Sequence, residues 1–186
     1  IELNILTNSL TANDVIAVHA GYMRYRKALL LGRVNLFELK SKRSRRLIKK
    51  SWAKRPLDRA SRYCRRQHKD HHRWLNRSTA SLHAKTFSVD GELLFVGSFN
   101  FDPRSAAVNT ELGAIIESPV LAQQLDDMIE KWTKELSYVV SIDNDKLAWT
   151  DQSLDPLQTF DNEPDSNWRQ RCLVWLIGKL PIEDFL

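Results

Sequence analysis

A histidine, a lysine and several small polar residues recur at short intervals between Ser81 and Asn100. His83 and Lys85 stand two residues apart in an alternating stretch, so on a β-strand both side chains lie on the same face. An imidazole can attack phosphorus or transfer a proton near neutral pH. An ammonium and a side-chain amide can stabilise the negative charge on phosphoryl oxygens. The stretch therefore predicts a site for phosphoryl chemistry, one that requires no metal and no cofactor.

A hairpin is expected to hold these residues. Asp90-Gly91 is a dipeptide typical of tight turns, and an apolar run of strand length follows it. The pattern predicts that the second strand ends at Gly97 and that Ser98 and Asn100 lie beside the first strand. A histidine and lysine pair alone would most often be a coincidence on a solvated hairpin. It is the six matched positions together that favour a phosphate site.

The six positions resemble the HKD motif of the phospholipase D superfamily, with the spacing His83-x-Lys85-x4-Asp90-x6-Gly97-Ser98-x-Asn100. The resemblance implies that one motif histidine attacks phosphorus and another protonates the leaving alcohol. We favour an acid and base role for His83 and leave the role of nucleophile open. Lys85 and Asn100 are expected to bind phosphate oxygens, and Ser98 to support that site. Asp90, at the turn, is expected to brace the motif.

Glu111 lies where members of this superfamily place a glutamate that hydrogen-bonds and orients the motif histidine. Such a carboxylate would fix the imidazole tautomer and stabilise the cation formed during transfer. Without the resemblance, Glu111 would be read as an exposed strand residue. The same comparison makes Asn8, Ser9 and Asn109 candidates to line the substrate site.

Other segments are similar to the second half of bacterial cardiolipin synthases, especially the type that uses phosphatidylglycerol with phosphatidylethanolamine: residues 6–10, 13–15, 19–22, 25–26, 35–39 and 163–183. This resemblance implies phosphatidyl transfer between phospholipids through a phosphatidyl-histidine, by a peripheral enzyme on the cytoplasmic side of the bacterial inner membrane. Two rival classes stay open. One is a phospholipase D hydrolase or nuclease with the same residues, acting on lipid or nucleic acid. The other is a non-catalytic membrane-binding fragment.

Enzymes of this type carry two HKD motifs whose histidines meet, whereas the sequence shows one. Residues 68–70 spell His-Lys-Asp, but consecutive residues cannot share a strand face as His83 and Lys85 do. The sequence begins at Ile1, within an apolar run and without an initiator methionine. We therefore expect an N-terminal HKD half of the same enzyme to complete the site. A homodimer that brings together two copies of His83 is the alternative.

The hydrophobic pattern predicts an α/β fold, a mixed β-sheet flanked by helices on both faces. Strands are expected over residues 1–6, 34–39 and 112–116, and a closing hairpin over residues 138–149. A first helix is expected over residues 14–31, capped by Asn13 or Asp14 and ended by Gly32, with an apolar stripe of Val15, Val18, Tyr22, Tyr25 and Leu29. A second is expected from Ser118-Pro119, with a stripe of Leu121, Leu125, Met128, Trp132 and Leu136. Residues 1–150 are assigned to the catalytic half-domain and residues 151–186 to a C-terminal tail.

Charge is unevenly distributed. Residues 40–79 carry sixteen Lys or Arg and two Asp, a local charge of +14, and the rest of the chain carries −9. We expect a solvated basic insertion there, with no placeable counterpart in the family. It could dock on anionic lipid headgroups or nucleic acid phosphates, or have no dedicated partner.

The tail joins aromatic side chains with basic ones: Trp168, Arg169, Arg171, Trp175 and Lys179. This composition suits a membrane interface, although a helix docked on the sheet would look much the same, and the segment is too short to span a bilayer. The resemblance favours membrane contact.

The two cysteines, Cys64 and Cys172, provide no disulfide framework and suit a reducing compartment. Cys64 and the nearby histidines lack the spacing of common zinc sites.

Overall fold

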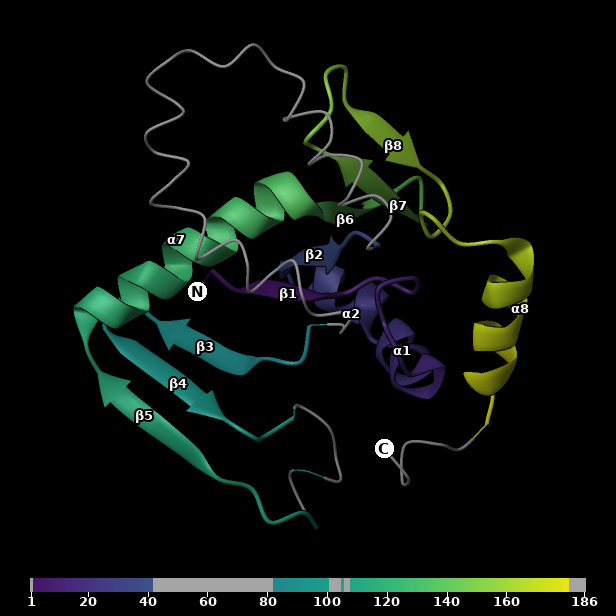
Figure 1. The fold of residues 1–186 in the computed structure, drawn as a ribbon. Coiled ribbons are helices and arrows are strands. Elements are labelled where there is room, and N and C mark those ends of the chain that lie inside the picture. The colour runs from purple at the N-terminus through teal and green to yellow at the C-terminus, as the bar shows by residue number, and fades with distance from the viewer. Residues whose placement is uncertain (1, 42–81, 101–104, 106–107, 181–186) are drawn as a thin grey trace, which may run out of the picture.

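The strands of the described residues form two sheets in place of the single mixed sheet expected (Figure 1). The computed structural model describes residues 2–41, 82–100, 105 and 108–180. The larger sheet has the spatial order β1 (Asn4–Asn8), β2 (Asn35–Leu39), β6 (Ser137–Asp143), β7 (Lys146–Asp151), β8 (Gln158–Phe160). The smaller sheet contains β3 (Lys85–Val89), β4 (Leu93–Gly97) and β5 (Gly113–Glu117). The predicted α/β class is confirmed, and most of the strands lie where the alternation placed them.

The five-stranded sheet contains the main apolar core of the described residues. Strands β1 and β2 are parallel, and the remaining neighbours are antiparallel. Its buried centre consists of Leu36, Tyr138, Val140 and Trp149. The β6–β7 hairpin turns at Asn144 and Asp145, whose φ angles of 46° and 67° are tolerated by these short polar side chains. The predicted closing hairpin is therefore confirmed, and β8 is an addition that the sequence did not reveal.

The HKD hairpin forms as predicted. Asp90 and Gly91 turn with φ angles of 52° and 68°, and the Glu92 N–H donates to the Val89 carbonyl at 3.0 Å across them. Gly97 faces Gly113 across the ladder, and the ring of Phe95 lies close over both. A Cβ on Gly97 would meet the Phe95 ring at 2.6 Å, and one on Gly113 would meet it at 2.4 Å. Glycine is therefore required at both positions because the aromatic ring fills the space of a side chain.

The first predicted helix is two helices. Helix α1 (Ile16–Met23) ends before Tyr25, and α2 (Arg26–Leu31) follows it with Gly32 at its C-cap. Val15 takes the N-cap position without a side-chain hydrogen bond. The backbone N–H of Val15 donates to Asn13 Oδ1 at 3.1 Å. The predicted apolar stripe is wrong at three of its members, which are about half exposed: Val15, Val18 and Tyr25. Instead the buried face contains the charged or small residues His19, Ala20, Gly21 and Arg26, so the helices are held partly by polar contacts that periodicity cannot detect.

Helix α7 (Pro119–Leu136) runs past both sheets (Figure 1). Ser118 caps it by accepting from the backbone N–H of Leu121 at 3.4 Å, and Pro119 occupies its first turn, as predicted. The helix contacts β2 and β6 of the larger sheet and β3 and β4 of the smaller one. Leu125 is buried, but Leu121 and Met128 are about 40% exposed, so the buried stripe is rotated toward Ala122.

Helix α8 (Trp168–Ile177) lies on the side of the molecule opposite the three-stranded sheet (Figure 1). Its first turn is closed by a capping box, in which Asn167 accepts from the Gln170 N–H and Gln170 accepts from the Asn167 N–H. Val174 is fully buried and packs against Leu10 and Ala20. Helix α8 therefore packs against α1. No helix within the described ranges is both long enough and apolar enough to cross a bilayer.

Candidate active site

His83 and Lys85 lie together at the start of the HKD hairpin. His83 is exposed, Lys85 is half-buried, and Lys85 Nζ contacts His83 Nε2. The prediction that the two side chains share a face is confirmed. An ammonium group can only donate hydrogen bonds, so Lys85 can act as a donor toward a ring nitrogen or toward a substrate oxygen. The site thus presents a basic ring nitrogen next to a cation, on a surface that a substrate can reach.

Ser98 and Glu111 form the second part of the cluster. The Ser98 hydroxyl donates to Glu111 Oε2 at 2.5 Å and accepts from the Leu112 N–H at 3.0 Å. The Ser98 hydrogen bond is the largest cause of a lowered Glu111 pKa, and the charge of Lys85 adds to it. Glu111 therefore stays ionised as an acceptor. Its hydrogen bond joins it to Ser98, so orientation of His83 by Glu111 stays a prediction.

The remaining motif residues surround this cluster unevenly. Asn109 hydrogen-bonds the Glu111 carboxylate and also donates to Ser105 Oγ at 3.3 Å, so it supports Glu111. Asn100 is exposed at the end of the segment that follows β4. Asp90 occupies the turn at the other end of β3, about 17 Å along the strand from Lys85 at roughly 3.3 Å per residue. The structure does not bring Asp90 together with the other motif residues.

The two candidate substrate-lining residues of β1 and its following loop are placed differently from the prediction. Both hydrogen-bonding ends of the Asn8 carboxamide contact the Leu82 backbone, the residue next to His83. Ser9 is only 1% exposed, so it does not line an open surface.

Lys40, assigned above to the solvated basic insertion, is fully buried and ion-paired with Asp151 at 2.5 Å. Residues 42–79 of that insertion, which include residues 68–70 and Cys64, lie outside the described residues.

A second polar cluster, buried between α1, α2 and the larger sheet, was missed by the sequence analysis. Arg26, 1% exposed, pairs with Glu38 at 2.8 Å between Nε and Oε1, and also with Glu163. His19 Nε2 lies 3.2 Å from Glu163 and 2.8 Å from Arg26 Nη2. Tyr22 and Trp149 each donate to Glu38 at 3.0 Å. The signal that could have found this cluster was a charged residue on an otherwise apolar helix face.

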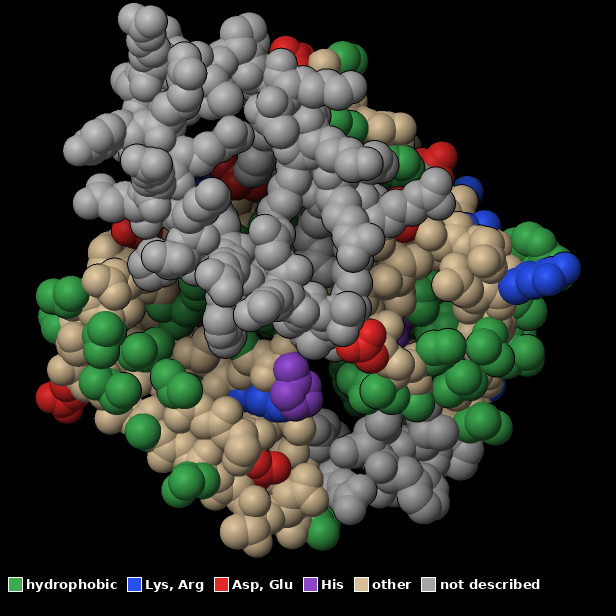
Figure 2. Space-filling model, in the orientation of Figure 1, with side chains coloured by type: hydrophobic (Ala, Val, Ile, Leu, Met, Phe, Trp, Pro, Cys, Tyr) green, Lys and Arg blue, Asp and Glu red, His purple; other side chains and the backbone are tan. Residues whose placement is uncertain are grey.

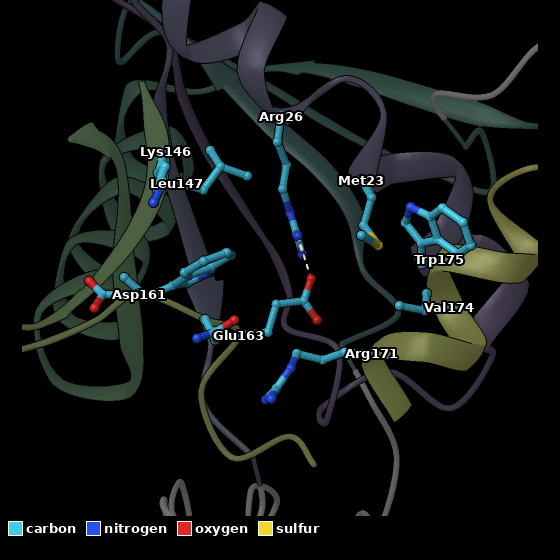
Figure 3. A pocket seen from close by; sticks show the side chains of 11 residues that line it. Met23, Arg26, Lys146, Leu147, Asp161, Glu163, Arg171, Val174 and Trp175 are labelled. Atoms are coloured by element: carbon cyan, nitrogen blue, oxygen red, sulfur yellow. Dashed lines mark hydrogen bonds and ion pairs between the residues drawn. The ribbon is translucent and has the colours of Figure 1, made fainter. Parts of the chain in front are cut away.

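Burial and pairing oppose each other in this cluster. Burial lowers the pKa of Arg26, but the charges of Glu38 and Glu163 outweigh it and raise the pKa above its ordinary value. Burial raises the pKa of Glu163, but the contacts with His19 and Arg26 outweigh it and hold that pKa below its ordinary value. Figure 3 shows the Arg26–Glu163 pair in the wall of a pocket of about 400 Å³. None of the HKD motif residues lines this pocket.

The tail presents part of the predicted interfacial face. Trp168 and Trp175 are 66% and 56% exposed, and their rings lie 5.6 Å from the Arg169 guanidinium and 5.3 Å from Lys179 Nζ. Figure 2 shows hydrophobic side chains gathered over α8 beside a basic one. Arg171 does not belong to this face, because it is half-buried, donates to the Ser166 carbonyl at 3.2 Å and lines the pocket.

The described residues offer no group of three or more histidine, cysteine or carboxylate side chains that could hold a metal ion.

Comparison with known proteins decides the family. A family model described as "Cardiolipin synthase, PLD-like domain" matches residues 1–132. The chain belongs to this family. The resemblance inferred from the HKD motif is thereby confirmed.

Several bacterial proteins are similar to this chain. The protein named cardiolipin synthase C of Escherichia coli K12 is 40% identical over 185 residues, which are 98% of this chain and 35% of that protein. An uncharacterised protein of Helicobacter pylori J99 is 29% identical over 93% of this chain and 30% of its own length. A cardiolipin synthase of Listeria welshimeri is 46% identical over 46 residues, 25% of this chain and 10% of that protein. No solved structure matches.

Two facts follow from these lengths. The chain spans about a third of the length of the first two relatives. The alignment with the E. coli protein covers nearly the whole chain, so residues 40–79 fall within the aligned range.

Proposed function

We propose that this chain supplies one histidine half-site for phosphatidyl transfer between phospholipids, the reaction that forms cardiolipin. The observation that carries the proposal is the exposed His83–Lys85 pair beside the Ser98–Glu111 hydrogen bond, in a chain of the cardiolipin synthase family. Lys85 supplies positive charge for the phosphodiester, and Ser98 and Asn100 supply hydrogen bonds. Glu111, ionised and fixed by Ser98, stabilises positive charge in the site.

The reaction takes two displacements at phosphorus. In the first, a histidine nitrogen bonds to the phosphorus of a donor phospholipid while the bond from phosphorus to the headgroup oxygen breaks. A second histidine gives its proton to that oxygen, and the headgroup alcohol leaves. In the second displacement, a hydroxyl of phosphatidylglycerol loses its proton to the same second histidine as its oxygen bonds to phosphorus and the phosphorus–nitrogen bond breaks.

We assign His83 to the acid and base role in both steps. In this structure His83 Nε2 contacts Lys85 Nζ on an exposed surface, where an imidazole can exchange a proton with a substrate oxygen. A phosphate oxygen arriving in the site offers Lys85 a stronger, charged acceptor and so frees Nε2. The nucleophile role stays open, because the same lone pair would serve it.

The second histidine must come from elsewhere, since one imidazole cannot hold the phosphoryl group and protonate the leaving group in the same step. We propose that an N-terminal HKD half of the same gene product supplies it, with a second copy of this chain as the alternative. Alone, the chain is expected to turn over only as a dimer. Sedimentation combined with activity measurements checks this, and turnover by a strictly monomeric chain would contradict it.

We further propose that the enzyme is peripheral on the cytoplasmic side of the inner membrane and that α8 contacts the bilayer. Trp168 and Trp175 would lie at headgroup depth, and Arg169 and Lys179 would meet anionic phosphates, each contributing about 1 kcal/mol. Residues 168–180 contain no acidic side chain that would oppose this docking. Flotation with phosphatidylglycerol vesicles should weaken when both tryptophans are changed to alanine. The matched control is Val120→Ala on α7, which removes a similarly exposed apolar side chain; equal binding by all variants would contradict the docking.

The catalytic test uses the full-length gene product with labelled phosphatidylglycerol, with and without phosphatidylethanolamine, and separately with single-stranded DNA. His83→Ala should lower formation of labelled cardiolipin by at least about 10³-fold. Lys131→Ala, which changes an exposed lysine on α7, should leave it unchanged. Labelled phosphatidic acid in place of cardiolipin would identify a hydrolase. DNA cleavage that His83→Ala abolishes, with no labelled cardiolipin from either lipid mixture, would identify a nuclease.

A further inference from the structure

The backbone of His83 lies just outside the sheet that carries the motif. The register of β3 with β4 begins at Lys85, which pairs with Gly97. His83 therefore precedes the first paired residue by two positions. The ladder fixes the chain on the Lys85 side, and another contact must fix it on the Leu82 side if the imidazole is to keep one position.

The side chain of Asn8 makes that contact. Its Nδ2 donates to the Leu82 carbonyl at 2.8 Å, and its Oδ1 accepts from the Leu82 N–H at 3.0 Å. One carboxamide thus binds both backbone groups of the residue directly before His83. A carboxamide has the donor and acceptor geometry of a peptide group, so Asn8 provides with its side chain the pair of hydrogen bonds that a neighbouring strand would provide.

Asn8 is itself firmly held. It is the last residue of β1 and pairs with Leu39 in the parallel register of the larger sheet. The next residue, the buried Ser9, donates its backbone N–H to the Leu39 carbonyl at 3.3 Å. The contact therefore ties the segment that carries His83, 74 residues further along the chain, to the carboxyl edge of the five-stranded sheet.

We propose that Asn8 is a positioning residue for His83, an inference that rests on the proposed function. It holds the Leu82 backbone so that the imidazole lies beside the reacting phosphodiester together with Lys85 and Ser98. The role requires asparagine. Aspartate lacks the donor for the Leu82 carbonyl, glutamine is longer by one methylene, and alanine lacks both groups.

The expected effect is on turnover more than on binding. A catalytic group displaced by about 1 Å loses about 10²-fold in rate. Asn8→Ala in the full-length gene product should therefore lower kcat about 10²-fold and change KM less than about threefold, because Lys85 and Ser98 remain in place. Asn8→Asp keeps the acceptor for the Leu82 N–H, so its kcat should lie between those of the wild type and Asn8→Ala. Asn4→Ala is the matched control, since Asn4 is an exposed residue at the other end of β1.

A second measurement is independent of activity. The Leu82 amide hydrogen should exchange slowly in the wild type and in Asn4→Ala, and quickly in Asn8→Ala, while the amides of β1 keep their protection. The NMR signals of the His83 ring should broaden or split in Asn8→Ala as the imidazole samples more positions. Restored protection and partial activity in Asn8→Asp would support the proposal.

The outcomes separate this inference from the proposed function. Full transfer activity in His83→Ala would overturn the function and leave Leu82 protection unaffected. Inactive His83→Ala together with wild-type kcat in Asn8→Ala would overturn the positioning role. Loss of the thermal unfolding transition in Asn8→Ala would also overturn it, because Asn8 would then be required for the fold. A tenfold rise in KM with unchanged kcat would place Asn8 in substrate binding and overturn it likewise.

Discussion

The described part of the chain combines a histidine, a carboxylate and a basic side chain in two places, and the two places differ in burial. His19, Glu163 and Arg26 lie together beneath the helices, each less than 10% exposed. His83, Glu111 and Lys85 lie at the end of an open hairpin, where His83 is exposed. Buried charges satisfy one another and hold distant segments together, whereas an open cluster leaves its lone pairs and protons available to a substrate. Residue types alone do not distinguish a structural cluster from a reactive one.

The two clusters should differ most in stability when the basic side chain of each is removed. Arg26→Ala leaves Glu38 and Glu163 buried without their partner and should lower the free energy of unfolding by about 3–5 kcal/mol. Lys85→Ala, at the open cluster, should change it by less than about 0.5 kcal/mol while it impairs transfer. Urea unfolding midpoints measure both. Similar losses of stability in the two variants would erase the distinction between the clusters.

The pH dependence of stability offers a finer test. Because the folded-state pKa of Glu163 lies below its ordinary value of 4.5, its contribution to stability is present above that pH and is lost as the pH falls through the folded-state pKa. Glu163→Gln should therefore be less stable than the wild type at neutral pH, and the difference should shrink in acid. Thermal melts between pH 7 and pH 3 check this. A difference that grows with acidity would have the wrong sign.

A smaller effect is expected at the open cluster. Ser98→Ala removes the hydroxyl that donates to Glu111 and should raise the Glu111 pKa toward 4.5. Carbon-13 NMR titration of the Glu111 carboxylate measures this pKa. Ser88→Ala in the same hairpin serves as the control, since the Ser88 hydroxyl donates to Asp126 and not to Glu111. An unchanged Glu111 titration in Ser98→Ala would mean that the other neighbours, Ser105, Asn109 and Lys85, lower the Glu111 pKa.

The smallest effect belongs to an ion pair that neither cluster contains. Lys134 and Glu130 pair at 2.5 Å across one turn of α7, with side chains 66% and 63% exposed. Lys134→Ala should lower the free energy of unfolding by no more than about 0.5 kcal/mol, and added salt should reduce even that. Urea midpoints at low and high salt provide the measurement. A loss above 1 kcal/mol would show that exposure does not set the strength of pairs here.

The sequence predicted those features that are encoded locally. The HKD hairpin, its positive-φ turn at Asp90-Gly91 and the Ser118-Pro119 start of α7 follow from turn, cap and alternation rules that involve few neighbouring residues. The resemblance to known motifs supplied the family. The proximity of His83 and Lys85 was predicted from a strand that contains both, although β3 begins only at Lys85.

Features that depend on distant partners were not predictable in this way. Arg26 and Lys40 look like surface residues until Glu163 and Asp151 are folded against them. The division into two sheets depends on whether β3 pairs with β1, and a side chain, Asn8, takes the place of that pairing. The apolar stripe of the first helix failed for the same reason, because a buried salt bridge selected the opposite face.

The Arg26–Glu163 pair has a consequence for the order in which the chain matures. Glu38 follows Arg26 closely in the sequence, but Glu163 is translated about 125 residues after Glu38. At roughly 5–20 residues per second, a ribosome needs about 6–25 s to deliver it. During that interval the α1–α2 unit carries an incompletely neutralised guanidinium. The buried pair can therefore close only after the segment that contains Glu163 has been translated, well after α1 and α2.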